Sequence, residues 1–295
     1  MKKISWIPKY DDIKKYASSR IRVHYPHTTL NKNFSGEYES VIGFDPTADV
    51  LIVQKRYDAT TLNALRSFKG LKIFDFDDPI PMGEAQRIAD IITTDTQGRK
   101  EDFDRLNMGK TAIVLEDCLD YGVTDIMETP DVSNRLVWFG NYPMVSSIKW
   151  MFPTILNSNF KMSAISDSHN LHVPAGINKI QWDVDNFISD LRSSNICVLS
   201  HKDWDKNKSN NKMIIAIACG VPCIVNGSIS YSELANKFSL GYSIVNTPKE
   251  LQDTMEFLNV KENRENYLKE IQPYIINKLS SNNITKKLIN IIENA

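Results

Sequence analysis

A polar and basic run stands directly before an apolar segment near position 210. The run consists of Lys208, Ser209, Asn210, Asn211 and Lys212. Serine and asparagine often begin helices, and the first N–H groups of a helix have no partner inside it. Because those groups and the helix dipole attract negative charge, the flanking lysines indicate an anion site that suits a diphosphate. A solvated polar loop before a buried helix is the alternative interpretation.

An acidic group follows an apolar run in the first half of the chain. Asp75, Asp77 and Asp78 stand at the end of this run, directly before Pro79. A turn is one interpretation, because Asp-Pro is typical of turns. Carboxylates that bind an acceptor or take part in catalysis are a second, with Asp77 as the catalytic candidate. A metal site is a third, and we do not expect one here.

Basic residues near position 20 are further candidates on the acceptor side. Arg20 and Arg22 alternate, so an extended backbone would place both on one face, where they could contact a phosphate or an acceptor. Arg20 is a catalytic candidate in this interpretation, and a solvated face is the alternative for both arginines. His24 lies nearby, although a lone histidine is usually structural.

In the second half of the chain, further polar residues follow apolar runs. Ligands of open parallel sheets bind beyond the carboxyl ends of the strands, so these residues are candidates for donor binding. Glycine there allows the backbone to approach a phosphate closely. The candidates are Gly140, Asn141, His201, Tyr231 and Glu233, with Lys202 and Trp204 as weaker ones.

Short apolar runs alternate with helical patterns along the chain, which indicates parallel sheets with crossover helices. We predict strands at residues 3–7, 50–54, 72–76, 91–94, 111–115, 135–139, 160–165, 196–199, 222–225 and 241–244. We predict helices at residues 10–19, 60–67, 83–91, 98–106, 146–155, 182–193, 211–219, 230–237 and 248–258, and two more after residue 261. The fold class is therefore α/β, with two Rossmann-like domains whose parallel sheets face each other across a cleft.

The pattern pauses at a turn-rich stretch around residues 125–134. We therefore expect a Rossmann-like domain at residues 1–130 and a second one at residues 131–295, with the terminal helices bracing the two. The family resemblance described below implies that the first binds the acceptor and the second binds the donor. Residues 133–295 carry 17 Lys and Arg against 14 Asp and Glu, which weakly favours an anionic ligand in that half.

Composition excludes several classes of protein. The net charge of −1 argues against a dominant, sequence-independent grip on nucleic acid. The four cysteines have no zinc-site spacing and indicate reduced thiols in a cytoplasmic protein. The N-terminal residues lack the apolar core of a signal peptide, and no apolar run is long enough to cross a membrane.

Residues 208–225 resemble the nucleotide-sugar signature of retaining GT-B glycosyltransferases (glycosyl transferases group 1, or family-4-like), of which this chain would be a compact member. That signature is written K-S-x-x-K-hydrophobic-x-E-A-x-A-x-G-x-P. Shorter stretches are similar in the expected order, among them residues 17–23, 48–56, 74–78, 89–96 and 138–141. One departure concerns Ile215, which occupies the position of the family's glutamate that contacts the donor ribose. Glu233, in a segment that resembles the family's Y-x-E element, is a replacement, and Tyr231 of the same element would cover the sugar.

The resemblance implies a glycosyltransferase that moves a sugar from a UDP- or GDP-linked donor, with retention of configuration and without an obligatory metal. The helix start at Lys208 and Lys212 would stabilise the leaving diphosphate. None of these motifs encodes the acceptor, and we expect a glycan, a lipid-linked glycan or a modified DNA base. The alternatives are an epimerase or a phosphorylase on the same fold, and an inactive sugar-nucleotide-binding module, which the residue at position 215 motivates.

Overall fold

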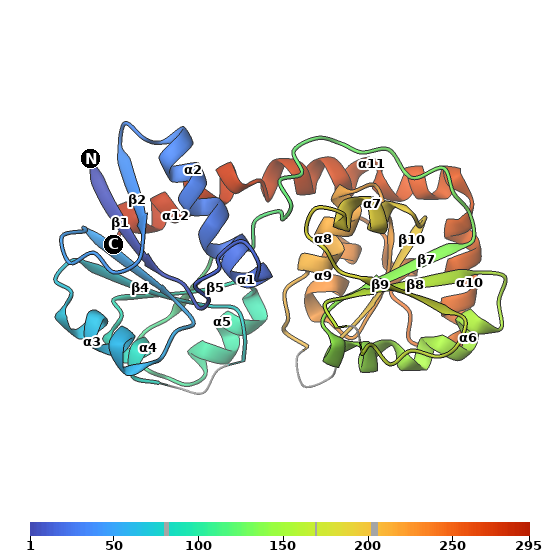
Figure 1. Cartoon of the computed structure of the whole chain (residues 1–295), viewed down its shortest axis with the longest axis horizontal. Coiled ribbons are helices and arrows are strands. Elements are labelled where there is room, and N and C mark those ends of the chain that lie inside the picture. Colours follow the sequence, from blue (N-terminus) through green and yellow to red (C-terminus); the bar gives the residue numbers. More distant parts are fainter. Residues whose placement is uncertain (80–82, 169, 202–205) are drawn as a thin grey trace. The chain divides into compact units, whose positions relative to one another are not determined.

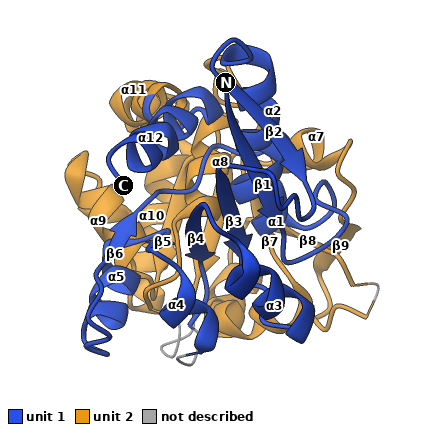
Figure 2. Cartoon of the chain, turned by 90° about the vertical axis from the view of Figure 1, so that its left-hand side faces the viewer, with its two compact units in different colours: residues 1–120, 278–295 blue, residues 121–277 orange. Residues whose placement is uncertain are grey.

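The computed structural model describes residues 1–79, 83–168, 170–201 and 206–295. The chain divides into two compact units, which Figure 2 shows in blue and orange. Unit 1 comprises residues 1–120 and 278–295, and unit 2 comprises residues 121–277. The first boundary thus falls at residues 120 and 121 rather than near residue 130, and the chain returns to unit 1 for its last helix.

Unit 1 is built on a parallel sheet. In the part of the chain that the structure describes, the sheet has six strands in the order β2-β1-β3-β4-β5-β6. The strands are β1 (Lys2–Ile7), β2 (Tyr38–Ile42), β3 (Val50–Gln54), β4 (Leu71–Phe76), β5 (Ile91–Thr94) and β6 (Ala112–Val114). Every neighbouring pair runs parallel, so all strands end at the same edge of the sheet.

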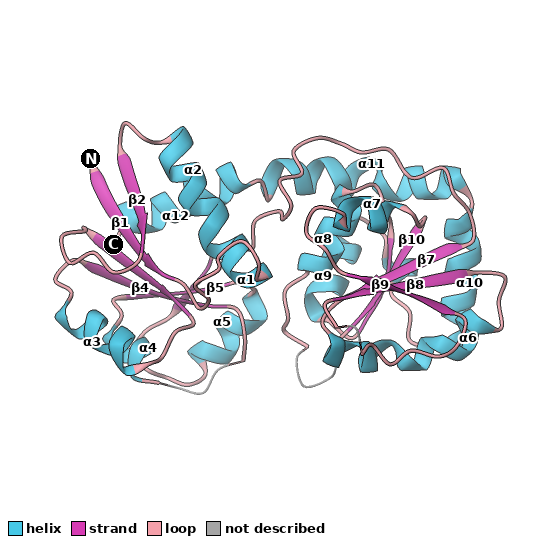
Figure 3. Ribbon diagram, viewed as in Figure 1, coloured by secondary structure: helices cyan, strands magenta, loops and turns pink. Residues whose placement is uncertain are grey.

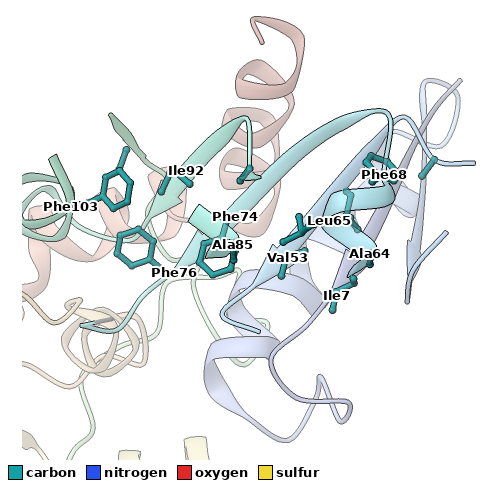
Figure 4. Close-up of a cluster of buried hydrophobic side chains, with 14 residues drawn as sticks. Ile7, Val53, Ala64, Leu65, Phe68, Phe74, Phe76, Ala85, Ile92 and Phe103 are labelled. Carbon is teal, nitrogen blue, oxygen red and sulfur yellow. The ribbon is translucent and has the colours of Figure 1, made fainter. Parts of the chain in front are cut away.

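Helices cover both faces of this sheet, with α2 and α12 on one side and α3, α4 and α5 on the other (Figure 1). The helices are α1 (Ala17–Ser19), which continues as a π-helix (Arg20–His24), α2 (Tyr25–Asn33), α3 (Ala59–Ser67), α4 (Glu84–Ile88), α5 (Gln97–Asp104) and α12 (Ser281–Glu293). Figure 4 shows one core cluster, in which Val53, Leu65 and Phe74 pack between the sheet and α3. Burial of such side chains typically contributes about 1.5–3 kcal/mol each.

Unit 2 repeats the plan with a parallel sheet of order β11-β10-β7-β8-β9. Its strands are β7 (Arg135–Phe139), β8 (Lys161–Ser166), β9 (Ile177–Gln181), β10 (Ile196–Ser200) and β11 (Cys223–Asn226). Its helices are α6 (Phe152–Leu156), α7 (Phe187–Arg192), α8 (Asn211–Ala218), α9 (Ile229–Lys237), α10 (Pro248–Asn259) and α11 (Lys261–Lys278), with 3-10 turns at Tyr142–Met151 and Gly241–Ser243. Helices α8 and α9 lie on one side of the strands, and α6 and α10 lie on the other (Figure 3).

The predicted α/β class with two parallel sheets is confirmed. The predictions missed β2, β9 and α2, and two predicted elements were wrong. Residues 10–19 form mainly a loop, with a helix only from Ala17, and residues 241–244 form a 3-10 turn. The turn itself spans Gly241–Ser243, and Ile244, which follows it, pairs with Val225 through a single parallel bridge.

Helix α8 ends as its sequence predicts. Gly220 adopts a φ of +78°, and the N–H groups of Gly220 and Val221 donate to the carbonyls of Ile217 and Ala216. This is the Schellman arrangement, which a glycine adopts without strain. A side chain is also excluded there, because a Cβ on Gly220 would lie 2.5 Å from the carbonyl oxygen of Glu128.

A search for membrane-crossing helices among the described residues finds none that is long and apolar enough.

Candidate functional site

The start of α8 in unit 2 brings a lysine ammonium against a glycine. Lys212 lies in the first turn of α8, and its Nζ atom is 2.6 Å from the position that a Cβ on Gly140 would occupy. Gly140 directly follows β7, and its N–H donates to the carbonyl of Ile165 at 3.0 Å. The same Nζ atom lies 5.8 Å from the ring centroid of Trp138. The sequence predicted both Lys212 and Gly140 for this site, and the structure places them together.

The Lys212 ammonium has no counter-ion within the part of the chain that the structure describes. Among the described residues, no carboxylate and no hydrogen-bond acceptor pairs with it, and the indole N–H of the buried Trp138 is likewise without an acceptor. Burial, and secondly the positive charge of Lys208, lower the pKa of Lys212 to about 8. An uncompensated cation at a helix N-terminus favours an anionic ligand, because the anion offsets its desolvation.

The turn before α8 is fixed by two serines. The hydroxyls of Ser228 and Ser230 both donate to the carbonyl of Lys208, at 3.1 and 2.9 Å. Asn210 occupies the N-cap position, but its side chain makes no capping hydrogen bond. The Asn210 side chain therefore does not occupy the first N–H groups of α8. Ser209 is buried, whereas Lys208 and Asn211 are half-buried.

His201 and Tyr231 form a buried pair beside this turn. The Nε2 atom of His201 lies 3.0 Å from the hydroxyl of Tyr231, and both side chains are buried. Gly227 packs on the same loop, where a Cβ would lie 2.3 Å from the carbonyl oxygen of His201. Tyr231 has no exposed surface, so the structure favours a role in holding His201 over a role in covering a sugar.

The remaining donor-side candidates lie on the surface or outside the described residues. Asn141 is exposed and begins the 3-10 turn after β7, and Glu233 is exposed on α9. Ile215 is 3% exposed and belongs to the apolar side of α8, so this position contributes to the core and offers no ribose contact. Lys202 and Trp204 lie outside the described residues.

In unit 1, Arg20 is neither a free ligand contact nor part of a solvated face. Its guanidinium makes a two-point ion pair with Asp120, at 2.7 and 2.6 Å, and its Nη1 atom donates to the carbonyls of Lys14 and Lys15. The residue is 3% exposed. The predicted extended backbone is wrong, because the backbone there is helical, and the side chain ties two loops together. The catalytic role of Arg20 stays a prediction.

The Arg22 guanidinium is likewise held in buried ion pairs and hydrogen bonds. It forms a two-point ion pair with Asp75, at 2.7 and 2.5 Å, and donates from Nη1 to Asp117 and to the carbonyl of Leu115. Thr93 adds a hydrogen bond to Asp75. All of these side chains are buried and form one ion-pair network. Contacts of Arg22 and Asp75 with an acceptor stay a prediction.

The other two acidic candidates, Asp77 and Asp78, both pair with Lys55, which was not among the predicted site residues. Its Nζ atom lies 2.6 Å from Asp77 and 2.6 Å from Asp78. Lys55 and Asp77 are buried, whereas the Asp78 side chain is 44% exposed. Lys55 also has a φ of +47°, which is unusual for a residue other than glycine and marks local strain at the end of β3. The Asp77 carboxylate is thus buried against an ammonium group, and its catalytic role stays a prediction.

His24 and Asp95 complete this end of the unit 1 sheet. Burial, and then the charges of Lys14 and Arg20, lower the pKa of His24. Burial, and then the charge of Asp117, raise the pKa of Asp95 well above its ordinary value. Asp95, like Lys55 and Asp117, follows a strand, so the rule applied to Asp75 would have found them. Among the described residues, no group of three or more His, Cys, Asp or Glu is arranged to hold a metal ion.

Two successive parallel α/β units, with the candidate anion site at the strand ends of the second, define the GT-B class of fold. No protein-family model and no curated protein matches the chain. Solved structures match it along its whole length, at identities that show the fold alone.

Anabaena HepE in complex with UDP and glucose has a TM-score of 0.66 and 11% identity, and the match covers 100% of both chains. The O-GlcNAc transferase of Thermobaculum terrenum has a TM-score of 0.56 and 12% identity over 99% of this chain and 67% of its own. A Listeria monocytogenes protein designated a UDP-N-acetylglucosamine 2-epimerase has a TM-score of 0.59 and 13% identity over 99% and 95%. The chain therefore has the GT-B fold.

Proposed function

We propose that this chain is a glycosyltransferase that binds a nucleoside-diphosphate sugar on unit 2 and transfers the sugar to an acceptor on unit 1. The observation that carries the proposal is the unpaired ammonium of Lys212 against Gly140 at the start of α8. The fold match to Anabaena HepE, which was solved with UDP and glucose, supports it.

In the proposed reaction, the bond between the anomeric carbon and the diphosphate oxygen breaks, and a bond from that carbon to an acceptor oxygen forms. The acceptor loses its proton, and negative charge grows on the leaving diphosphate. Lys212, Lys208 and the first N–H groups of α8 are the groups that would stabilise this charge. We propose retention of configuration because residues 208–225 resemble the signature of retaining enzymes.

A ligand panel tests the donor assignment. Ligands that bind only the folded state raise the apparent melting temperature. We expect UDP-glucose, UDP-N-acetylglucosamine or a GDP-linked sugar to raise it, and UDP to raise it as well, since the diphosphate is the group recognised. A panel in which neither the sugar nucleotides nor the free diphosphates shift the melting temperature would contradict the proposal.

An epimerase is the second candidate, because the Listeria neighbour bears that designation. Incubation with UDP-N-acetylglucosamine and no acceptor separates the two functions. An epimerase forms the epimeric sugar nucleotide, whereas a transferase needs an acceptor or releases free sugar slowly. A phosphorylase would depend on inorganic phosphate. A pure binding module, which Ile215 motivates, would give the thermal shift without any turnover.

We further propose that the transfer needs no metal ion and takes place in the cytoplasm, where the four buried, unpaired cysteines would stay reduced. Full activity in excess EDTA is the expected result for the first point. A modified DNA base stays an alternative acceptor, and a steep loss of DNA binding with added salt would support it.

A further inference from the structure

Trp138, on β7 of unit 2, carries an indole N–H group that has no acceptor within the described part of the chain. Its side chain has no exposed surface. A buried indole N–H usually finds a partner, because a buried donor without one costs free energy. Two other tryptophans follow this rule: the indole of Trp6 donates to Ser40 at 2.8 Å, and that of Trp182 donates to Tyr121 at 3.0 Å. Trp138 therefore calls for a specific explanation.

The edge of the indole that bears the N–H group lies beside Gly140. The Cζ2 atom of Trp138 is 3.1 Å from the position that a Cβ on Gly140 would occupy, and Nζ of Lys212 is 2.6 Å from the same position. Cζ2 is bonded to the ring carbon that carries Nε1, so the edge that faces Gly140 is the N–H edge. Because residue 140 has no side chain, the indole edge and the ammonium meet at one place.

The electrostatic surroundings of this place are positive. The charged groups that act on the Lys212 ammonium are Lys208 and, more weakly, the thiol of Cys197, and neither is a carboxylate. Lys212 also lies in the first turn of α8, where the helix dipole favours an anion. The place thus combines a neutral donor and a cationic donor, and neither of them has an acceptor among the described residues.

This pair of donors matches the chemistry of a phosphoryl group. Its oxygens carry negative charge and several lone pairs, so one oxygen can accept from an indole N–H and from an ammonium at the same time. A sugar hydroxyl would accept one of these bonds but would leave the charge of Lys212 without compensation. The ligand that fits both donors is therefore an oxyanion.

We propose that the indole N–H of Trp138 binds a phosphoryl oxygen of the nucleoside diphosphate, next to the ammonium of Lys212. The proposal rests on the proposed transferase function and adds a residue to its donor site. The Cε atom of Lys212 lies 3.4 Å from the Cβ position of Gly140, so the end of the lysine side chain occupies part of this place. It must move aside as the oxygen enters, which its flexible four-carbon stem allows.

Proton–nitrogen NMR of the full chain observes the indole N–H groups directly. The probes are UDP, inorganic pyrophosphate and uridine, and Trp138→Phe assigns the Trp138 signal by its disappearance. We expect UDP and pyrophosphate to shift the Trp138 indole proton downfield, because a hydrogen bond to a charged oxygen deshields it, and uridine to leave it unchanged. The indole signal of Trp6 is the internal control, because that N–H already has an acceptor in unit 1.

Trp138→Phe and Trp6→Phe form a matched pair, because each removes the same atoms from a buried residue of a strand. Isothermal titration should show roughly tenfold weaker UDP binding, or more, in Trp138→Phe, since a hydrogen bond to a charged group is lost. The factor should be the same at about pH 6.5 and about pH 9, because an indole N–H does not titrate. Trp6→Phe loses its bond to Ser40 and should bind UDP like the unaltered chain.

The proposal is wrong if UDP raises the melting temperature but no indole proton moves downfield, or if Trp138→Phe binds UDP as tightly as Trp6→Phe does. A shift with uridine but not with pyrophosphate would also overturn it, because the contact would then belong to the nucleoside. These outcomes leave the proposed function standing, whereas the absence of a thermal shift with any sugar nucleotide or diphosphate contradicts that function itself. Circular dichroism confirms that each variant is folded, and the spectrum of the unaltered chain decides the question if Trp138→Phe is not.

Discussion

The carboxyl edges of the two sheets hold their basic side chains in opposite electrostatic states. In unit 1, Arg22 and Lys55 sit among aspartates that neutralise them. In unit 2, Lys212 stands against a glycine and an indole with no carboxylate to pair with among the described residues. The same topology thus supports two different uses of positive charge. Paired charges hold neighbouring segments together, whereas a positive charge without a counter-ion at a helix N-terminus favours binding of an anionic ligand.

The largest expected effect is on the stability of unit 1. Replacing Arg22 by Met leaves the buried carboxylates of Asp75 and Asp117 without this counter-ion. We expect the loss to lower the free energy of unfolding by about 3–5 kcal/mol. Urea titration of the full chain measures this. Lys249→Met is the control, because its pair with Asp253 is exposed and should contribute well under about 1 kcal/mol. An equal decrease in the free energy of unfolding for the two variants would show that the Arg22 ion pairs are solvated like the exposed pair of Lys249 and Asp253.

Lys212→Met should behave in the opposite way. It removes the candidate contact to the diphosphate and should lower turnover roughly 10²- to 10³-fold. Stability should not fall and is expected to rise, because the fold no longer has to hold a half-buried, partly desolvated cation that has no partner among the described residues. Steady-state kinetics and urea titration on one sample separate the two effects. The control is Lys179→Met, an exposed lysine on β9. A stability loss with normal turnover would mean that Lys212 is structural.

Gly140→Ala tests whether donor binding depends on the exact position of the Lys212 ammonium. The new Cβ would lie 2.6 Å from Nζ of Lys212 and 3.1 Å from the Trp138 ring, so the ammonium must move away. The donor should then bind roughly tenfold more weakly, the typical value of one displaced charge-assisted hydrogen bond. Isothermal titration with UDP measures the change. Wild-type affinity in this variant would place the diphosphate elsewhere.

The pH dependence of donor binding is the smallest effect. The Lys212 pKa of about 8 is below the ordinary lysine value, so its charged fraction falls as the pH rises through 8. An anion needs the charged form, so UDP affinity should be full at pH 6–7 and fall roughly fourfold between pH 7 and 8.5. Titrations across this window measure it. Lys212→Met should bind UDP weakly without this pH dependence, and an identical profile in that variant would assign the titration to another group.

The buried strands of the fold were predicted from the sequence, whereas the edge strands β2 and β9 were missed. Strands β3 and β7 consist of apolar runs because both of their faces are covered, so they stand out. Strands β2 and β9 lie at sheet edges and keep polar residues such as Glu39 and Lys179 on their exposed sides. Their pattern resembles that of a loop, and only the ladder with a neighbouring strand identifies them.

The candidate site divides along similar lines. Lys212 and Gly140 were predicted because a helix start and a strand end are visible in the local sequence. The fate of Arg20 and Arg22 was not, because their partners Asp120 and Asp75 stand 100 and 53 residues away. The residues next to an arginine in the sequence do not indicate whether a carboxylate from a distant segment will form an ion pair with it in the fold. Lys55 was missed for the same reason, since its role depends on the end of the neighbouring strand.

The path of the chain has a consequence for biosynthesis. Unit 2 is one continuous stretch, whereas unit 1 needs α12, which packs on α2 and connects Lys287 to Glu116 and Glu293 to Tyr38. A ribosome therefore releases all six strands of the first unit long before the helix that covers them. Unit 2 can fold on its own while the face of the N-terminal sheet that α2 and α12 share is still incompletely covered. That interval is the period in which unit 1 is most exposed to aggregation.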